Sequence, residues 1–405
     1  MALASQETPP HKNTMILTQC AVCATELGLT RGKKCGRCST RYCGAACQEQ
    51  HWKDGGHDKL CKKIKKAGGA EQFNANTKYA EAVAVAAEAC AEDTKGQTCY
   101  ICTQALHWKT KEGLVRGCAC RGTAGFAHVS CLAEQAKILV AEAEENNLGS
   151  DALDGKWERW HTCGLCEQSH HGVVHCALGW ACWKTYLGRP EADWARVSAM
   201  RQLANGLSAA DHDEDALTVE KAQLSIEQRL GAPEESLLSN LANIAVTYGD
   251  LGLHEKSLSM ERDIYSGWFR LNGEEHESTL LAANNYAVSL RDLQHFDEAR
   301  SLLRKTLPVA RRVFGESSEF TLTMRKIYAT VLYEDDSSTP DDLREVVRTL
   351  EETEQTARRV LGGAHPLTVE IGDNLRVARE TLAAREGDDV SSVCDGVDAM
   401  TPGGA

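Results

Sequence analysis

Apolar and polar positions in the second half of the chain repeat with a period of 42 residues. Each period holds a glycine, a leucine seven residues later, and an aliphatic or aromatic residue followed by alanine. The positions are Gly231, Gly273 and Gly315; Leu238, Leu280 and Leu322; and Ile244-Ala245, Tyr286-Ala287 and Tyr328-Ala329. The pattern in each unit predicts a helix, a turn and a second helix. Because one helix pair cannot bury its apolar side alone, such units stack, and the pattern predicts a mostly α-helical solenoid over residues 194–384.

The repeat also has irregular units. Gly362 follows Gly315 by 47 residues, and the five extra residues fall in the acidic stretch EDDSSTPDD. An earlier, shorter unit begins near Trp194, where LANGL echoes LANIA of the next unit. The segment NNYAVSLRDLQHFDEARSLLRKTLPVARRVFG resembles the tetratricopeptide repeats of kinesin light chains. The resemblance implies a superhelix whose concave face is lined by the first helix of each pair.

Asparagines recur on these first helices. They occupy equivalent positions in four units, while Ile327 stands there in the fifth; the four are Asn205, Asn243, Asn285 and Asn374. In the related repeats such asparagines hold the backbone of an extended peptide, so the resemblance implies a peptide groove. Arg291 and Lys326 would add positive charge for an acidic peptide. The alternative is that the asparagines are ordinary solvent-facing helix residues.

The segments outside the repeats differ in composition. Residues 1–19 are polar and are expected to form a flexible leader, and residues 385–405 are rich in Gly, Asp and Ser and are expected to be disordered. Residues 62–97 include AEAVAVAAEACAED, which favours a helical connector. Residues 169–193 contain an amphipathic pattern that predicts a linker helix.

Length and charge limit the possible functions. A chain of 405 residues is too long for one ordinary core, which predicts two to four domains. The formal net charge of −13 argues against nucleic-acid binding, although residues 1–70 alone carry 12 basic and 5 acidic residues. No apolar run approaches the ~20 residues of a membrane span, and the polar N-terminus lacks a signal peptide. We therefore expect a soluble protein of the cytosol or nucleus.

Cysteines form two clusters with matching histidines. The first, within residues 20–61, comprises Cys20, Cys23, Cys35, Cys38, Cys43, Cys47, His57 and Cys61. The second, within residues 98–168, comprises Cys99, Cys102, Cys118, Cys120, His128, Cys131, Cys163 and Cys166. Paired Cys-x-x-Cys with interspersed histidine indicates metal rather than disulfides in a reducing compartment. Since structural zinc takes four N/S ligands, each cluster predicts two zinc ions, four in all.

The first cluster resembles the MYND zinc finger. Its ending RYCGAACQEQHWKDGGHDKLC carries the ligand order of that family together with Tyr42, Gln48 and Trp52. The resemblance implies interleaved sites, with Cys20, Cys23, Cys43 and Cys47 on one ion and Cys35, Cys38, His57 and Cys61 on the other. His51, a rival ligand, lacks the right distance to Cys61. In the family this module binds short peptides of partner proteins and has no catalytic role.

The second cluster resembles the RING-CH, or RING-variant, finger. The stretch CACRGTAGFAHVSCL matches closely in its Cys-x-Cys pair and its His-x-x-Cys-Leu ending. A PHD finger shares the ligand order but would place a Trp two residues before the seventh ligand, whereas Trp160 is three before Cys163. Cross-bracing would give Cys99, Cys102, His128 and Cys131 for one ion and Cys118, Cys120, Cys163 and Cys166 for the other. The loop before Cys163 is longer than is usual for the family.

The RING-CH resemblance implies recruitment of a ubiquitin-conjugating enzyme. In that family an aliphatic residue before the second ligand, here Ile101, contacts the enzyme, and so does an aromatic residue before the seventh, here Trp157 or Trp160. Leu165 would border the same groove. Two hypotheses follow: a ubiquitin ligase whose repeats and MYND finger bind substrate peptides, or a non-enzymatic scaffold in which these apolar residues only join the zinc lobes. No catalytic triad, phosphate loop or open metal site occurs, so catalysis would act by proximity.

Overall fold

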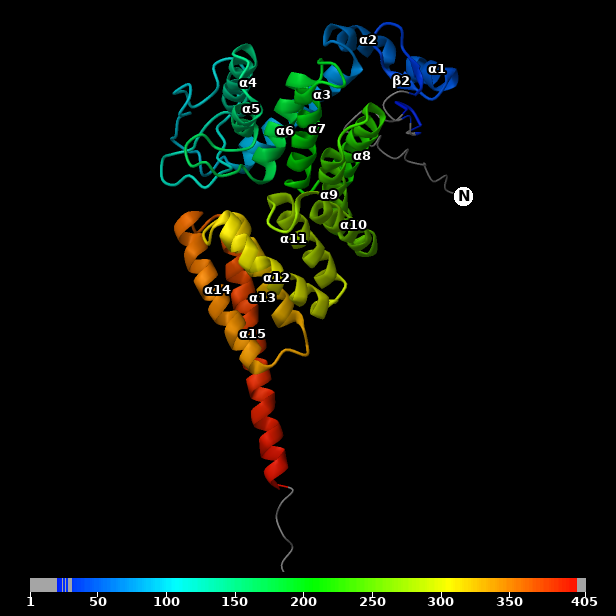
Figure 1. Cartoon of the computed structure of the whole chain (residues 1–405). Coiled ribbons are helices and arrows are strands. Elements are labelled where there is room, and N and C mark those ends of the chain that lie inside the picture. Colours follow the sequence, from blue (N-terminus) through cyan, green and yellow to red (C-terminus); the bar gives the residue numbers. More distant parts are fainter. Residues whose placement is uncertain (1–19, 24, 26, 28–30, 399–405) are drawn as a thin grey trace, which may run out of the picture. The chain divides into compact units, whose positions relative to one another are not determined.

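The computed structural model describes residues 20–23, 25, 27 and 31–398, with side chains described as far as 386, and it confirms the mostly α-helical class. The predicted leader therefore lies outside the described residues. The chain forms two compact units that meet in sequence between Ala232 and Pro233, except that the loop 118–122 groups with the second. Consequently α7 (Trp194–Ser208) and α8 (Asp213–Leu230), which lie within the predicted repeat array, belong to the first unit. Figure 1 shows the order of the elements.

The first unit contains a two-stranded antiparallel sheet and eight α-helices among its described residues. Its elements are β1 (Lys33–Lys34), β2 (Arg41–Tyr42), α1 (Ala45–Lys53), α2 (His57–Lys66), α3 (Ala70–Ala89), α4 (Val129–Glu145), α5 (Ser150–Trp157), the 3-10 turn η1 (Glu158–Trp160), α6 (Gly172–Tyr186), α7 (Trp194–Ser208) and α8 (Asp213–Leu230). The second unit is formed by α9 (Glu234–Asp250), α10 (His254–Asn272), α11 (Glu277–Asp292), α12 (Phe296–Phe314), α13 (Glu319–Glu334), α14 (Pro340–Val360) and α15 (Pro366–Asp398). None of the described helices is long and apolar enough to cross a bilayer.

Helix α6 lies at the centre of the first unit. It packs against α3, α4 and α7, and it is buried on more than the single face that an amphipathic linker helix would use, because Trp180, Cys182 and Trp183 are also buried. The expected connector helix α3 is likewise part of this core, through Ala75, Val83 and Ala86. The second zinc finger therefore packs against helices α3 and α6.

Helices α6 and α7 approach closely at two glycines, which leads to a stability prediction. A β-carbon on Gly206 would lie 2.8 Å from the backbone oxygen of His175, and one on Gly179 would lie 2.9 Å from that of Gln202. We expect Gly206→Ala to destabilise the first unit by about 1–3 kcal/mol, because backbone atoms must move apart. Gly155→Ala, in α5 with open space around it, should instead be neutral or slightly stabilising. Urea unfolding of both variants measures the effect. A neutral Gly206→Ala would contradict the close approach of the α6 and α7 backbones.

The second unit is built from helix pairs, as the 42-residue period predicts. Each helix packs against the next, and the first helices α9, α11, α13 and α15 also contact one another in sequence. The periodic glycines stand at the ends of the second helices, where Gly273, Gly315 and Gly362 have φ of 79°, 88° and 98°. Glycine adopts these angles without a Cβ clash, which explains why it recurs at the turns.

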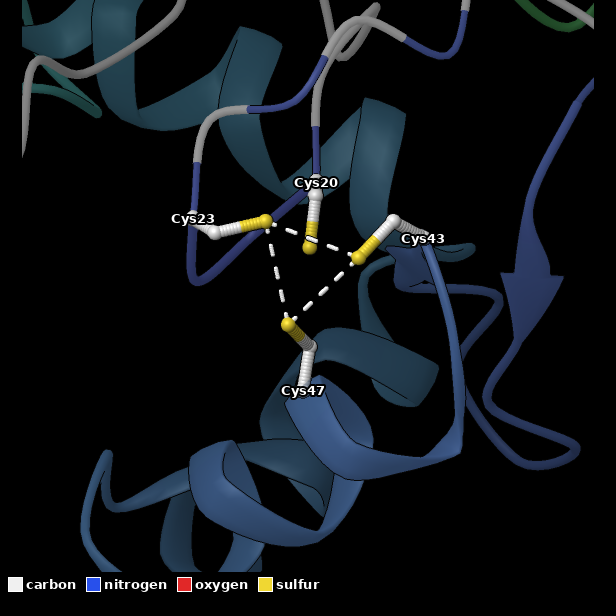
Figure 2. A group of neighbouring side chains, drawn as sticks. All are labelled: Cys20, Cys23, Cys43 and Cys47. Atoms are coloured by element: carbon white, nitrogen blue, oxygen red, sulfur yellow. Dashed lines mark hydrogen bonds between the residues drawn. The ribbon is translucent and has the colours of Figure 1, made fainter.

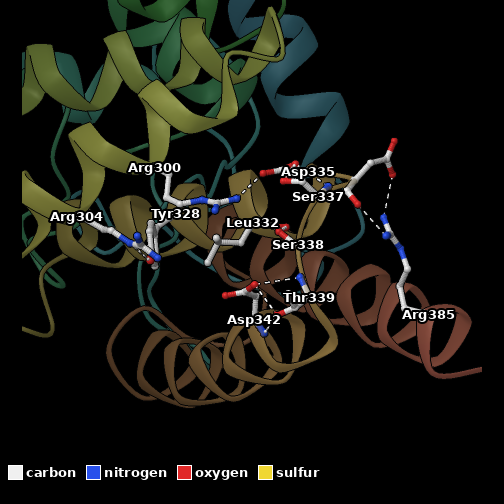
Figure 3. A network of polar contacts seen from close by, with 11 residues as sticks. Arg300, Arg304, Tyr328, Leu332, Asp335, Ser337, Ser338, Thr339, Asp342 and Arg385 are labelled. Atoms are coloured by element: carbon white, nitrogen blue, oxygen red, sulfur yellow. Dashed lines mark hydrogen bonds and ion pairs between the residues drawn. The ribbon is translucent and has the colours of Figure 1, made fainter. Parts of the chain in front are cut away.

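Polar contacts hold the five-residue insertion before α14 in place (Figure 3). Arg300 pairs with Asp335, and Arg385 of α15 pairs with Asp336 at 2.9 Å. Thr339 and Asp342 form a capping box at the start of α14. Helix α15 is described as far as Asp398, past residue 385 where the tail was expected to begin, and Arg344 pairs with Glu386 of this helix at 2.8 Å. Residues 399–405 of the expected tail lie outside the described residues.

Candidate zinc sites and interaction surfaces

Four cysteines of the first finger converge on one point (Figure 2). Cys20 and Cys23 come from the N-terminal knuckle, Cys43 follows strand β2, and Cys47 lies in the first turn of α1. The Sγ atoms of Cys23 and Cys43 are 3.5 Å apart, those of Cys43 and Cys47 are 3.5 Å apart, and those of Cys47 and Cys23 are 3.7 Å apart. The four ligand atoms all lie within 4.8 Å of one another.

The second group of this finger is fully buried. It joins Cys35 and Cys38, beside the β1–β2 hairpin, to His57 and Cys61 of helix α2. Cys35 and Cys61 are 3.9 Å apart at sulfur, and Cys38 Sγ lies 3.4 Å from His57 Nε2. His57 and Cys61 face the same way because residues four apart share one side of a helix. The groups are those implied by the MYND resemblance.

Neighbouring polar groups orient the ligands of the first finger. Thr25 Oγ1 lies 3.0 Å from Cys23 Sγ, and Thr40 Oγ1 lies 3.1 Å from Cys38 Sγ. The hydroxyl of Thr25 is the main cause that lowers the pKa of Cys23 to about 6, which favours the thiolate form that binds metal. His51, the rival ligand, instead has Nδ1 3.0 Å from the hydroxyl of buried Tyr42, and it belongs to neither ligand group.

The second finger supplies two further groups. Cys99, Cys102, His128 and Cys131 form one, in which His128 Nδ1 lies 3.4 Å from Cys102 Sγ and 3.6 Å from Cys131 Sγ. Cys118, Cys120, Cys163 and Cys166 form the other. Backbone N–H groups of Ile101 and Cys102 point at Cys99 Sγ, and that of Leu165 points at Cys163 Sγ. The two groups are those that the cross-braced arrangement of the RING-CH resemblance implies.

The distances between the ligand atoms fit zinc. With Zn–S of about 2.3 Å and Zn–N of about 2.0–2.1 Å, a tetrahedral site has S–S edges of about 3.8 Å and S–N edges of about 3.6 Å. The S–S distances of 3.5–3.9 Å and the S–N distances of 3.4–3.6 Å agree with such edges. Each group provides four donors and leaves no open position, so these sites suit a structural rather than a catalytic ion.

The structure separates the expected enzyme-contact residues into two classes. Ile101 and Leu165 are exposed, at 36% and 52%. Trp160 is fully buried, and Trp157 packs against Tyr186 and Trp194 with ring centroids 5.2 and 5.1 Å away. The expectation that one of these tryptophans faces a partner is therefore corrected for Trp160: the long loop before Cys163 carries it into the helical core of the first unit.

Ile101 and Leu165 belong to adjacent loops. A β-carbon on Gly164 would lie 4.0 Å from both Tyr100 OH and Gln135 Oε1, so the knuckle at Cys163 meets the knuckle at Cys99 and helix α4. One turn beyond Gln135, Ile138 is 46% exposed. Sequence reasoning missed Ile138, although its place on the helix after the sixth ligand could have suggested it. The three exposed residues Ile101, Ile138 and Leu165 are called the apolar knuckle surface below.

The repeat asparagines are only partly brought together. Asn205 lies in the first unit, whereas Asn243, Asn285 and Asn374 lie on first helices of the second unit. Asn374 lines a polar pocket of about 530 Å³ beside Arg291 and Tyr333, and its amide donates to Thr330 Oγ1 at 3.3 Å. Arg291 pairs with Asp292, and Lys326 pairs with Glu370, so the positive charge that we expected for an acidic peptide is already balanced here.

Three family models match this chain. Residues 20–61 match the MYND finger, residues 99–147 the RING-variant domain, and residues 279–319 the tetratricopeptide repeat. All three resemblances drawn from the sequence are thereby confirmed. The RING-variant match ends before Cys163 and Cys166, whose place in the fourth ligand group comes from the geometry. The modules support a zinc-finger protein that interacts with other proteins.

Two solved structures are similar to part of this chain. One is a putative kinesin light chain with nearly identical TPR-like repeats from Podosopora anserina, at 15% identity, covering 57% of this chain and 97% of that chain with a TM-score of 0.34. Another is BtubC (BKLC) from P. vanneervenii, at 14% identity, covering 68% of this chain and 95% of that chain with a TM-score of 0.35. No curated protein matches the sequence.

Proposed function

We propose that this chain is a RING-type ubiquitin ligase of the cytosol or nucleus that binds four structural zinc ions. Its second finger holds a ubiquitin-conjugating enzyme on the apolar knuckle surface, while the repeats and the MYND finger bind peptides of substrate proteins. The observation that carries the proposal is the exposure of Ile101 and Leu165 on adjacent zinc knuckles. Exposed aliphatic residues on neighbouring loops that metal ligation would hold rigid are suited to a protein partner.

The proposed reaction needs no catalytic side chain on this chain. The conjugating enzyme brings ubiquitin as a thioester, and a substrate lysine attacks the thioester carbonyl, which releases the enzyme's cysteine thiol. The finger would hold the enzyme, and the peptide-binding modules would hold the substrate, so the rate gain comes from proximity and orientation. The closed zinc sites are consistent with this role, because they offer no position for a substrate.

The ligase proposal predicts a specific mutational pattern. Ile101→Ala and Leu165→Ala should each lower ubiquitin-chain formation by about tenfold or more, since truncation at the centre of an interface commonly costs ~1–2 kcal/mol or more. Leu148→Ala serves as the matched control, because Leu148 is also exposed, at 42%, in the same unit. The assay uses the purified full chain with a panel of conjugating enzymes. If no enzyme supports chains with the unmodified protein, the non-enzymatic scaffold replaces the ligase.

A further inference from the structure

Helix α2 of the first finger carries a stripe of exposed lysines. Lys59, Lys62, Lys63 and Lys66 are spaced by three, one and three residues, so they share one face of the helix. The opposite face holds His57, Cys61 and Ile64, which are buried. These four lysines are called the α2 lysine stripe below.

The stripe differs from the basic residues of the second unit. Among the described residues, no lysine of the stripe forms an ion pair, and Asp58 is the one acidic residue of α2. In contrast, arginines of the second unit such as Arg270, Arg312 and Arg379 each pair with a glutamate. The positive charge of α2 is thus left available to a partner.

Zinc ligation at His57 and Cys61 would fix the helical form of this stripe. His57 and Cys61 belong to a closed ligand group, and Ile64 is 7% exposed in the core of the finger. Unwinding α2 would remove two zinc ligands. The basic residues of α2 would therefore be presented as a rigid helix face.

The charge of the finger remains positive with metal bound. Residues 20–70 carry 11 Lys+Arg and 4 Asp+Glu, a formal +7. Seven ligand thiolates and two zinc ions add −3, which leaves +4 on a chain whose formal total is −13. We propose that the α2 lysine stripe binds an acidic segment of a partner protein, independently of the peptide groove of the repeats.

The size of the stripe favours a short acidic peptide over a nucleic acid. Seven residues of helix rise by about 10 Å, which an extended peptide spans with three or four residues. Nucleic-acid binding generally draws on a broader basic surface, and the strongly acidic remainder of the chain would repel a long polyanion. Exposed lysines can follow the side chains of an acidic segment because their stems are flexible.

Fluorescence anisotropy of a labelled peptide of eight glutamates tests the proposal with the purified, zinc-loaded full chain. We expect binding that weakens by about tenfold or more between roughly 50 and 300 mM salt. The variant Lys59→Gln, Lys62→Gln, Lys63→Gln, Lys66→Gln should weaken it by about tenfold or more. Zinc content of the variant is measured in parallel, and the four lysines can be tested in pairs if the quadruple variant loses metal.

A second variant distinguishes binding by the α2 lysine stripe from an effect of net charge. Lys95→Gln, Lys109→Gln, Lys111→Gln, Lys156→Gln changes the formal charge equally at exposed lysines elsewhere in the first unit and should retain binding. Equal loss in both variants would overturn the proposal, as would failure of the unmodified chain to bind the peptide. Tighter binding to a single-stranded oligonucleotide or to anionic vesicles of matched charge would overturn it too. Chain formation in the ubiquitin assay is a separate readout, so the two proposals fail independently.

Discussion

Cys38→Ser is expected to unfold the first finger and to lower the zinc content from about four to about two ions per chain. Half of the buried apolar cluster of this finger consists of ligand cysteines, and its other members are Leu27, Tyr42, Ile64 and Ala70. Such a core is too small to fold alone, whereas a structural zinc contributes about 10–16 kcal/mol to folding. Because the two sites are interleaved, losing one should release the other. Metal analysis and limited proteolysis measure both effects.

The second finger provides a contrast within the same molecule. Its apolar cluster contains Phe126, Val129, Leu132 and residues of α3 and α6, so we expect a folded base to persist without metal. Cys102→Ser should therefore release zinc while the helices of the first unit stay protected from protease. Cys90→Ser, at a half-buried cysteine outside all four ligand groups, is the matched control and should change neither readout. Retention of about four zinc ions by Cys38→Ser would contradict the ligand assignment.

The ligand residues could be predicted from their spacing, whereas their division into groups follows from the resemblance to the MYND and RING-CH fingers. A Cys-x-x-Cys knuckle and two residues four apart on a helix, such as His57 and Cys61, can present donors in only a few ways. The helical repeats could also be predicted from sequence, because the 42-residue period places the same turn in each unit. Local patterns therefore predicted the helical repeats and the candidate ligand residues.

Tertiary packing could not be predicted in the same way. The burial of Trp160 depends on a loop that places it against α6. The local sequence, with Trp157 three residues earlier, fits an exposed position equally well. The close approach of α6 and α7 depends on Gly179 and Gly206 facing backbone across an interface, which no single-helix pattern reveals. The division after Ala232 likewise interrupts a sequence repeat that looked continuous.

One glutamate breaks the repeat pattern inside the second unit. The buried stripe of α10 consists of Ser257, Glu261, Ile264 and Trp268, and Glu261 is fully buried with no hydrogen-bond partner for either carboxylate oxygen. The equivalent position one period later is Leu303, also fully buried. Burial raises the pKa of Glu261 to about 8, because the charged form loses its hydration and gains no partner.

Glu261→Leu is therefore expected to stabilise the second unit by about 3 kcal/mol at pH 7. The folded chain binds a proton that the unfolded chain releases above its ordinary pKa near 4.5, so stability conferred by the neutral carboxyl falls as pH rises from about 4.5 to about 8. Leucine has no proton to lose, and the pH dependence in this window should disappear with it. Glu255→Leu, at an exposed position of the same helix, should leave that dependence in place. Urea unfolding at pH 5, 7 and 8.5 would refute the assignment if Glu261→Leu and the unmodified chain lost stability in parallel.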